Sequence, residues 1–273
     1  MELANRVCLI AGASGAIGSA IAQRFCEEGA DVVTTYLSNP PSFRRPGIGE
    51  NRELEFELDV CSYEQTQIVL RKVVDKFGRI DALVNCAGVI GPIGPTQDID
   101  IKDWVRAVEV NLIGSFCLTH SVLPFMLAQS HGKIIHFSGG GAAYARPFCT
   151  AYAASKAALV RLVESLAAEL RQSHIEVNAI APGPVYSRMW EEMRTAGQKG
   201  GDNNLQELKK MEETGGVPAD RAADLSVFLA SERSNGLSGR LISAVHDDWK
   251  TLEGRIADVM NSERGTLRRV PFD

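Results

Sequence analysis

The sequence lacks the features that mark exported or membrane-bound proteins. Its six cysteines are scattered and include no Cys-x-x-Cys pair. The residues before Cys8 do not form the charged and then apolar start of a signal peptide. No uninterrupted apolar run approaches the ~18 residues that a membrane-spanning helix needs. These absences predict a cytoplasmic protein with reduced cysteines and no membrane partner.

An excess of positive charge is also missing. The chain has 29 Lys and Arg against 34 Asp and Glu, a net charge of −5, which weighs against binding to nucleic acid. Of its 273 residues, 45% are apolar and 23% charged, so it can bury an ordinary core. It contains no internal repeat, no low-complexity tract and no linker. We therefore expect a single domain over residues 1–273.

What the chain does contain is a regular alternation of strand and helix patterns. Nearly all-apolar strands that alternate with amphipathic helices predict a parallel sheet covered on both faces. The fold class is therefore a doubly wound α/β fold. The strands are expected at residues 7–10, 31–36, 54–60, 80–84, 133–138, 174–181 and 240–245, and the clearest helices at 63–77, 98–128, 151–171 and 220–231.

Three regions depart from this alternation. The helical pattern at 98–128 is broken or kinked near Gly114 and Pro124. Residues 187–218 are polar and rich in glycine around a small apolar cluster, which is typical of a mobile flap over a site. The tail from 246 to 273 has only weak periodicity.

A glycine-rich turn follows the first strand. Gly12, Gly15 and Gly18 stand three residues apart, directly before an amphipathic helix. Small residues let a pyrophosphate approach the backbone, and the helix start offers free N–H groups. The pattern G-x-G-x-x-G is absent, so a purely structural turn is the alternative. The strand–turn–helix context favours a phosphate-binding turn.

Tyr152 and Lys156 lie four residues apart at the start of the 151–171 helix, and therefore on one face of it. A free tyrosine has a pKa near ~10 and exchanges protons poorly at neutral pH. A neighbouring cation lowers that pKa, so the pair predicts an acid/base. Taken alone, this spacing is more often a solvated helix face.

Together these stretches resemble the short-chain dehydrogenases/reductases, in their shorter single-domain branch, over nearly the whole chain. The resemblance rests on Asn85-Cys86-Ala87-Gly88, Asn111, the Tyr152–Lys156 pair and the Pro182-Gly183 turn. It implies a Rossmann-like doubly wound sheet and hydride transfer between NADP(H) or NAD(H) and a carbonyl or secondary-alcohol substrate. The glycine spacing, with Ala11 and Ala16 where the shorter branch has Thr and Gly, looks like the sugar-nucleotide epimerase branch instead.

The resemblance also implies roles for individual residues. Ser138 would donate to the substrate carbonyl and Tyr152 would exchange the proton. Lys156 would lower the tyrosine pKa and hold the cofactor ribose, and Asn111 would kink its helix and position a water. The remaining cofactor contacts expected are Gly12, Ser14, Gly15, Ala16, Ile17, Gly18, Tyr36, Ser38, Asp59, Val60, Asn85, Ala87, Gly88, Pro182, Gly183, Val185 and Ser187. The expected substrate contacts are Gly139, Tyr144, Phe148 and Trp190.

Cofactor preference depends on the end of the second strand. NAD users of this kind carry an acidic residue there that bonds the adenosine ribose. This chain has Tyr36, Leu37 and Ser38 instead, which removes the repulsion against a 2′-phosphate. Ser38, or Arg44 and Arg45 in the following loop, could meet that phosphate. NADP(H) is therefore favoured over NAD(H).

Two other functions remain open at this point: a sugar or sugar-nucleotide dehydrogenase, and a non-catalytic NADP-binding regulator or scaffold. No metal site is expected, because His246, Asp247 and Asp248 are typical of a solvated turn. By resemblance, a homodimer or homotetramer would form through the helices at 98–128 and 151–171. The tail lacks the family's two closing glycines, which makes the usual packing at that end doubtful.

Overall fold

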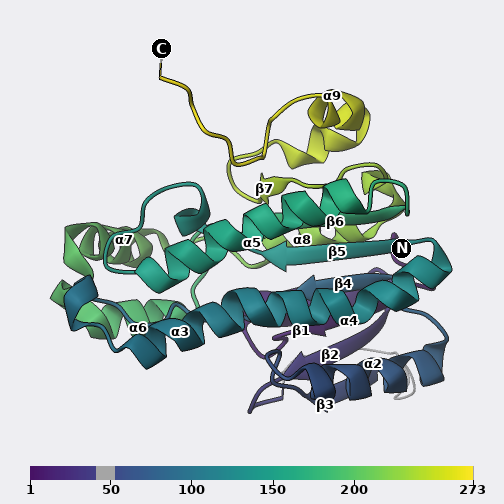
Figure 1. Ribbon diagram of the computed structural model, residues 1–273, viewed down its shortest axis with the longest axis horizontal. Coiled ribbons are helices and arrows are strands. Elements are labelled where there is room, and N and C mark those ends of the chain that lie inside the picture. The colour runs from purple at the N-terminus through teal and green to yellow at the C-terminus, as the bar shows by residue number, and fades with distance from the viewer. Residues whose placement is uncertain (41–52, 273) are drawn as a thin grey trace.

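A computed structural model describes residues 1–40 and 53–272. A seven-stranded sheet in the order β3-β2-β1-β4-β5-β6-β7 forms the centre of the molecule, and all its strand pairs are parallel (Figure 1). This confirms the predicted doubly wound α/β fold. The strands are β1 (Val7–Ala11), β2 (Asp31–Tyr36), β3 (Glu53–Glu57), β4 (Ala82–Asn85), β5 (Gly132–Phe137), β6 (Ile175–Ala181) and β7 (Leu241–Ser243).

Helices cover both faces of the sheet. One face packs against α1 (Ala16–Glu27) and α8 (Asp220–Ala230), whose apolar side chains form one buried cluster with odd-numbered residues of β5. The other face packs against α2 (Tyr63–Phe77), α4 (Gly114–Gln129) and α5 (Thr150–Glu169), which run side by side across the sheet in Figure 1. The apolar strands thus contribute to two cores, as strands buried on both faces do.

The long helical run before β5 is interrupted as predicted. It consists of α3 (Ile101–Val108), the π turn η3 (Glu109–Ile113) and α4, so the break comes directly before Gly114, while Pro124 lies inside α4. A π turn often marks a functional site, and this one carries Asn111. By length and composition, the helical run Ile101–Gln129 is also long and apolar enough to cross a membrane. A search for uninterrupted apolar residues does not find it, because polar residues are interspersed in it. In the structure, 44% of its most apolar window is buried inside the molecule.

The polar 187–218 region folds into helices. It contains α6 (Arg188–Ala196), the 3₁₀ turn η5 (Gly197–Gly200) and α7 (Gly201–Thr214). Met193 and Met211 are buried, so the region is anchored by its own apolar residues. Its mobility stays a prediction.

The C-terminal tail is also more ordered than its weak periodicity suggested. It forms η7 (Trp249–Arg255) and α9 (Ile256–Met260) and then returns along β7, where the Leu241 N–H donates to the Gly265 carbonyl over 2.7 Å. Arg240, only 6% exposed, donates to the Met260 and Arg264 carbonyls. These bonds hold the tail against the last strand of the sheet.

A buried carboxylate fixes the start of β1. Asp81 is 1% exposed and accepts hydrogen bonds from the Val7 N–H at 2.8 Å, Arg79 Nε at 2.8 Å and Arg6 Nη1 at 3.3 Å. Asp81→Ala leaves these donors without their acceptor, and we expect the free energy of unfolding to fall by roughly 3–5 kcal/mol. Urea denaturation measures this. The matched control is the exposed Asp75, where Asp75→Ala should change stability by less than about 0.5 kcal/mol; equal effects of the two substitutions would contradict this account.

Candidate active site

The residues singled out from the sequence gather where β1, β4, β5 and β6 end. In a doubly wound sheet, ligands bind at the carboxyl ends of the strands, where the strand order reverses. Here that reversal lies between β1 and β4, which are neighbours in the sheet. The glycine turn, Asn85, Ser138 and the Pro182 turn therefore lie at one edge of the sheet.

The glycine turn is built for close backbone packing. Gly12 has φ +75°, and a Cβ there would lie 2.7 Å from the Ala87 N atom. A Cβ on Gly18 would lie 2.4 Å from the Gly12 carbonyl oxygen. Helix α1 begins after Gly15 with no side-chain cap on its N–H groups. Free N–H groups behind a tight turn fit a pyrophosphate, so these residues suit a dinucleotide.

Asn85 and Asn111 tie β4 to the helices above it. Asn85 Nδ2 donates to Ser115 Oγ at 2.8 Å, and its Oδ1 accepts from the Ala87 N–H at 3.1 Å. Asn111 is completely buried, and its amide both accepts from and donates to the Val89 backbone at 2.9 Å. The two amides thus fix the backbone that follows β4.

Asn111 and Lys156 meet beside Gly88. A Cβ on Gly88 would lie 3.1 Å from Asn111 Oδ1 and 3.3 Å from Lys156 Nζ. Asn111 Nδ2 also donates to Ser155 Oγ at 3.0 Å. Lys156 is buried, donates to the Phe137 carbonyl at 2.7 Å, and has its pKa lowered to about 8 by burial. The structure therefore brings these two predicted residues together.

Tyr152 lies on α5 with Lys156, but the direction of its pKa shift differs from the sequence-based expectation. Lys156 Nζ lies 5.8 Å from the centroid of its ring. Burial raises the pKa of Tyr152 above its usual range, because a phenolate is poorly solvated there, and the cation that lowers this pKa is Arg146. The net shift of the Tyr152 pKa is therefore upward in this structure, and its lowering by Lys156 stays a prediction.

Ser138 and Gly139, which directly follow β5, have contrasting surroundings. The Ser138 hydroxyl is buried, and it has no hydrogen-bond partner within the described part of the chain. A Cβ on Gly139 would lie only 2.2 Å from the Tyr152 hydroxyl oxygen. The position that faces the tyrosine hydroxyl is therefore 139, while the role of Ser138 stays a prediction.

Two charged residues near Tyr152 were not singled out from the sequence. The Arg146 guanidinium carbon lies 5.9 Å from the Tyr152 ring centroid, and its Nη2 pairs with Glu207 Oε2 on α7 at 2.6 Å. Local sequence carries no signal for this pair, because its members are 61 residues apart.

The substrate residues predicted from the sequence are only partly brought together. Trp190 and Tyr152 both pack against a small apolar cluster of Ile90, Cys149 and Met193. Phe148 lies against Gly201 at the start of α7, where a Cβ would be 2.3 Å from its ring. Tyr144 is 79% exposed.

The turn after β6 has the tight backbone expected of it. Gly183 has φ +80°, and a Cβ there would lie 2.6 Å from the Val245 side chain. Pro182 and Val185 are buried, and Ser187 precedes α6. A side chain at 183 has no room, so the backbone itself forms this part of the site.

The residues expected at the adenosine end lie at the ends of β2 and β3. Tyr36 is half-buried and Ser38 exposed, while Arg44 and Arg45 fall outside the described residues. Asp59 Oδ2 pairs with Arg106 Nη2 at 3.0 Å. Burial raises the pKa of Asp59, but its hydrogen bonds and the Arg106 cation outweigh this effect and leave the pKa lowered.

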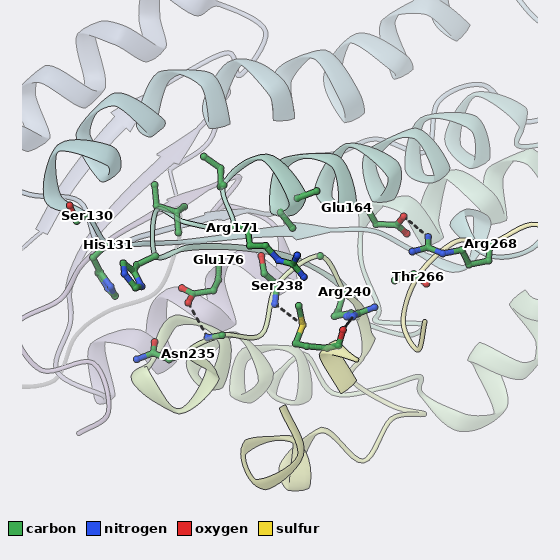
Figure 2. Close-up of a pocket in the computed structure, with 18 residues that line it drawn as sticks. Ser130, His131, Glu164, Arg171, Glu176, Asn235, Ser238, Arg240, Thr266 and Arg268 are labelled. Atoms are coloured by element: carbon green, nitrogen blue, oxygen red, sulfur yellow. Dashed lines mark hydrogen bonds and ion pairs between the residues drawn. The ribbon is translucent and has the colours of Figure 1, made fainter. Parts of the chain in front are cut away.

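A large cleft of about 820 Å³ lies at the opposite end of the sheet (Figure 2). It is lined from the starts of β5 and β6, the end of α5 and the tail, with Arg171, Arg240 and Arg268 among its residues. The Arg240 Nε has no hydrogen-bond partner among the described residues, but it is shielded from solvent and so cannot meet a ligand in the cleft. This cleft is separate from the Tyr152 site.

No group of three or more His, Cys, Asp or Glu side chains suited to a metal ion is found in residues 1–40 and 53–272. His246 and Asp247 instead form a turn with Ser243, whose hydroxyl accepts from the His246 N–H at 3.0 Å. The Asp247 carboxylate accepts from the Ser243 N–H at 2.6 Å.

Comparison with known proteins agrees with this geometry. Residues 6–198 match the family model described as short chain dehydrogenase. The chain is 35% identical over 250 residues to 3-oxoacyl-[acyl-carrier-protein] reductase FabG of Thermotoga maritima, covering 89% of this chain and 97% of that protein. It is 31% identical to galactitol 2-dehydrogenase of Agrobacterium fabrum, covering 91% and 99%. The aldohexose dehydrogenase structure of Thermoplasma acidophilum superposes with a TM-score of 0.73 at 26% identity, covering 88% and 92%. The chain belongs to the short-chain dehydrogenase/reductase family and is an NAD(P)-dependent oxidoreductase that acts on carbonyl or alcohol groups of small molecules.

Proposed function

We propose that Tyr152, Lys156 and Asn111 carry out the proton transfer of this oxidoreduction, at the edge of the sheet where the glycine turn binds the cofactor. The observation that carries the proposal is the meeting of Asn111 and Lys156 around Gly88, with Tyr152 one helical turn from Lys156. This arrangement favours turnover over the non-catalytic regulator or scaffold, which would have no need of a buried Lys156 held on the Phe137 carbonyl.

Each residue has a distinct task in this mechanism. The nicotinamide cofactor supplies or accepts the hydride. Tyr152 gives its proton to the alkoxide that develops in carbonyl reduction, and takes a proton from the alcohol in oxidation. Lys156 uses one N–H on the Phe137 carbonyl and has two others for the cofactor ribose hydroxyls. Asn111 fixes the backbone at Val89 and positions a water that links Lys156 to solvent.

The phosphates are assigned to the backbone from Gly12 to Gly18, including Ser14, Ala16 and Ile17. Asn85, Ala87 and Gly88 would line the middle of the cofactor, and the backbone at 182–187 its nicotinamide end. Asp59 and Val60 are assigned to the adenine.

We expect NADP(H) to bind more tightly than NAD(H). No carboxylate stands at the end of β2, where Tyr36, Leu37 and Ser38 follow one another, so a 2′-phosphate meets no like charge there. Fluorescence titration with NADPH and NADH measures the two dissociation constants. Ser38→Asp is the matched variant: its added carboxylate should reverse the preference. Equal affinity of the unmodified protein for both cofactors, or tighter NADH, would overturn this assignment.

Residues 187–218 are proposed to cover the substrate. Helix α6 brings Met189, Trp190 and Met193 into one apolar cluster with Tyr152, which gives the pocket an apolar wall. Gly139 and Phe148 are assigned to the opposite wall, and Tyr144, with its 79% exposure, to the rim.

A sugar or polyol is the second candidate substrate class. Two of the similar proteins are by name a galactitol 2-dehydrogenase and an aldohexose dehydrogenase. A panel of apolar ketones, polyols and aldohexoses, followed at the nicotinamide absorbance, distinguishes an enzyme for apolar carbonyl compounds from one for sugars and polyols. Turnover confined to the polyols and aldohexoses would select the sugar dehydrogenase.

We propose a homodimer or homotetramer formed through α4 and α5. Helix α4 leaves Phe116 and Leu127 nearly half exposed, and Ile113 just before it is exposed to the same extent. Such residues on one helix favour burial against a second copy.

All six cysteines are free, which supports a cytoplasmic location.

A further inference from the structure

The residue that faces the Tyr152 hydroxyl is Gly139, two residues after the end of β5, and it has no side chain. A Cβ at Gly139 would lie 2.2 Å from the hydroxyl oxygen and 3.1 Å from the ring carbon that carries it. Contacts below 3.0 Å are essentially never made by a real Cβ. The tyrosine hydroxyl therefore lies directly against the backbone at 139, and that position provides no hydroxyl to assist it.

The neighbouring Ser138 does not compensate for this. Its Oγ is shielded from solvent and has no hydrogen-bond partner within the described residues, Tyr152 included. The backbone is extended at Gly139, with φ −175° and ψ 177°, so consecutive side chains leave it on opposite sides. In this structure the shielded Ser138 hydroxyl is therefore not presented on the side of Gly139 that faces the Tyr152 hydroxyl.

Arg146 does reach Tyr152. Its guanidinium lies 5.9 Å from the ring centroid, within the range of a cation–π contact, and its side chain is only 21% exposed. Its Nη2 forms the 2.6 Å ion pair with Glu207 and also lies 3.6 Å from Met193 Sδ. The guanidinium is thus held between the tyrosine ring and both helices of the 187–218 region.

We propose that Arg146 is a positioning residue for the proton transfer at Tyr152: it holds the phenol ring and provides the positive charge that favours loss of the hydroxyl proton. Glu207 on α7 holds Arg146 in place. The proposal rests on the assignment of Tyr152 as the acid/base and deepens it.

The charges around the phenol predict opposite effects for the two members of the ion pair. Arg146 lowers the pKa of Tyr152, whereas Cys149 and Glu207 raise it, in addition to the larger rise that burial causes. The other cation near the ring is Lys156, at 5.8 Å. Removing the Arg146 charge should therefore raise the Tyr152 pKa, and removing the Glu207 charge should lower it.

The experiment measures alcohol oxidation as a function of pH. Oxidation needs the tyrosinate as base, so its rate rises with pH through the Tyr152 pKa. Arg146→Met should move this rise upward by roughly one pH unit, the effect expected when an opposite charge is removed. Arg146→Lys keeps the charge and should restore most of the original profile. Glu207→Gln keeps a side-chain oxygen that can accept from the Arg146 guanidinium, so Arg146 stays in place while the negative charge is lost, and the rise should move downward.

The outcomes separate this inference from the function on which it rests. If the unmodified protein shows no nicotinamide-dependent turnover, or Tyr152→Phe stays active, the assignment of Tyr152 fails. If both hold but the profiles of Arg146→Met and Glu207→Gln stay in place or move together, only the Arg146 inference fails. NADPH titration and thermal unfolding of each variant confirm that it is folded.

Ser138→Ala provides the remaining comparison. We expect it to lower the turnover rate less than Arg146→Met does, with no movement of the pH profile. A loss on the order of a hundredfold or more is what removal of a hydrogen-bond donor to a developing oxyanion causes. Such a loss in Ser138→Ala would make the serine the second group at the carbonyl, contrary to its position away from the Tyr152 hydroxyl.

Discussion

Replacing Tyr152 with phenylalanine should lower carbonyl reduction by roughly 10²–10⁴-fold, the contribution that a positioned acid or base makes. The substitution removes only the hydroxyl, which lies directly against Gly139. The ring, its contact with Arg146 and its packing in the apolar cluster stay in place. The enzyme should therefore remain folded while losing its proton donor.

The measurement combines activity with cofactor binding. Initial rates at saturating NADPH report the chemical step, and a fluorescence titration reports whether the cofactor site is intact. We expect unchanged NADPH affinity beside the lost turnover. The exposed Tyr63 on α2 offers a matched control, because Tyr63→Phe removes the same atom from a side chain that is 48% exposed and assigned to no site. If cellular function survives Tyr152→Phe undiminished, the protein acts as a cofactor-binding regulator.

Gly18→Ala should weaken cofactor binding by roughly tenfold to a hundredfold. Its Cβ would lie 2.4 Å from the Gly12 carbonyl oxygen and 2.9 Å from the Ala13 Cα, so the turn must open to admit it. Forcing a methyl group into a packed site costs about 1–3 kcal/mol, and each 1.4 kcal/mol lost from binding is tenfold. The opened turn would no longer direct its N–H groups at the phosphates.

The control for this variant is Gly254→Ala, where an added Cβ meets nothing within 4 Å. Both variants are titrated with NADPH and unfolded thermally. Gly18→Ala should lose affinity for NADPH and for NADH to a similar degree, because the turn is assigned to the phosphates that the two share. An unchanged affinity in Gly18→Ala would show that the glycine turn is structural and does not bind the cofactor.

Much of the fold follows from local pattern. The helix predicted at 63–77 has the bounds of α2, because Ser62 accepts from the Gln65 N–H at its start and Gly78, at φ +74°, ends it. The strand at 31–36 likewise has the bounds of β2, since its consecutive β-branched residues, Val32 to Thr35, favour an extended strand and are all buried. The third strand was predicted too long, to residue 60, because alternation continues past Glu57, where the pairing with β2 ends.

By itself, the sequence determined the order of strands and helices, the glycine turn and the pairing of Tyr152 with Lys156 on one helix face. These depend on residues close together along the chain, whose spacing fixes their geometry. Tertiary structure alone decided which charges act on Tyr152 and which residue faces its hydroxyl. Arg146 and Glu207 meet across 61 residues, and burial, which sets the direction of the Tyr152 pKa shift, depends on every element packed around it. No local pattern encodes either, because both arise only when the chain has folded.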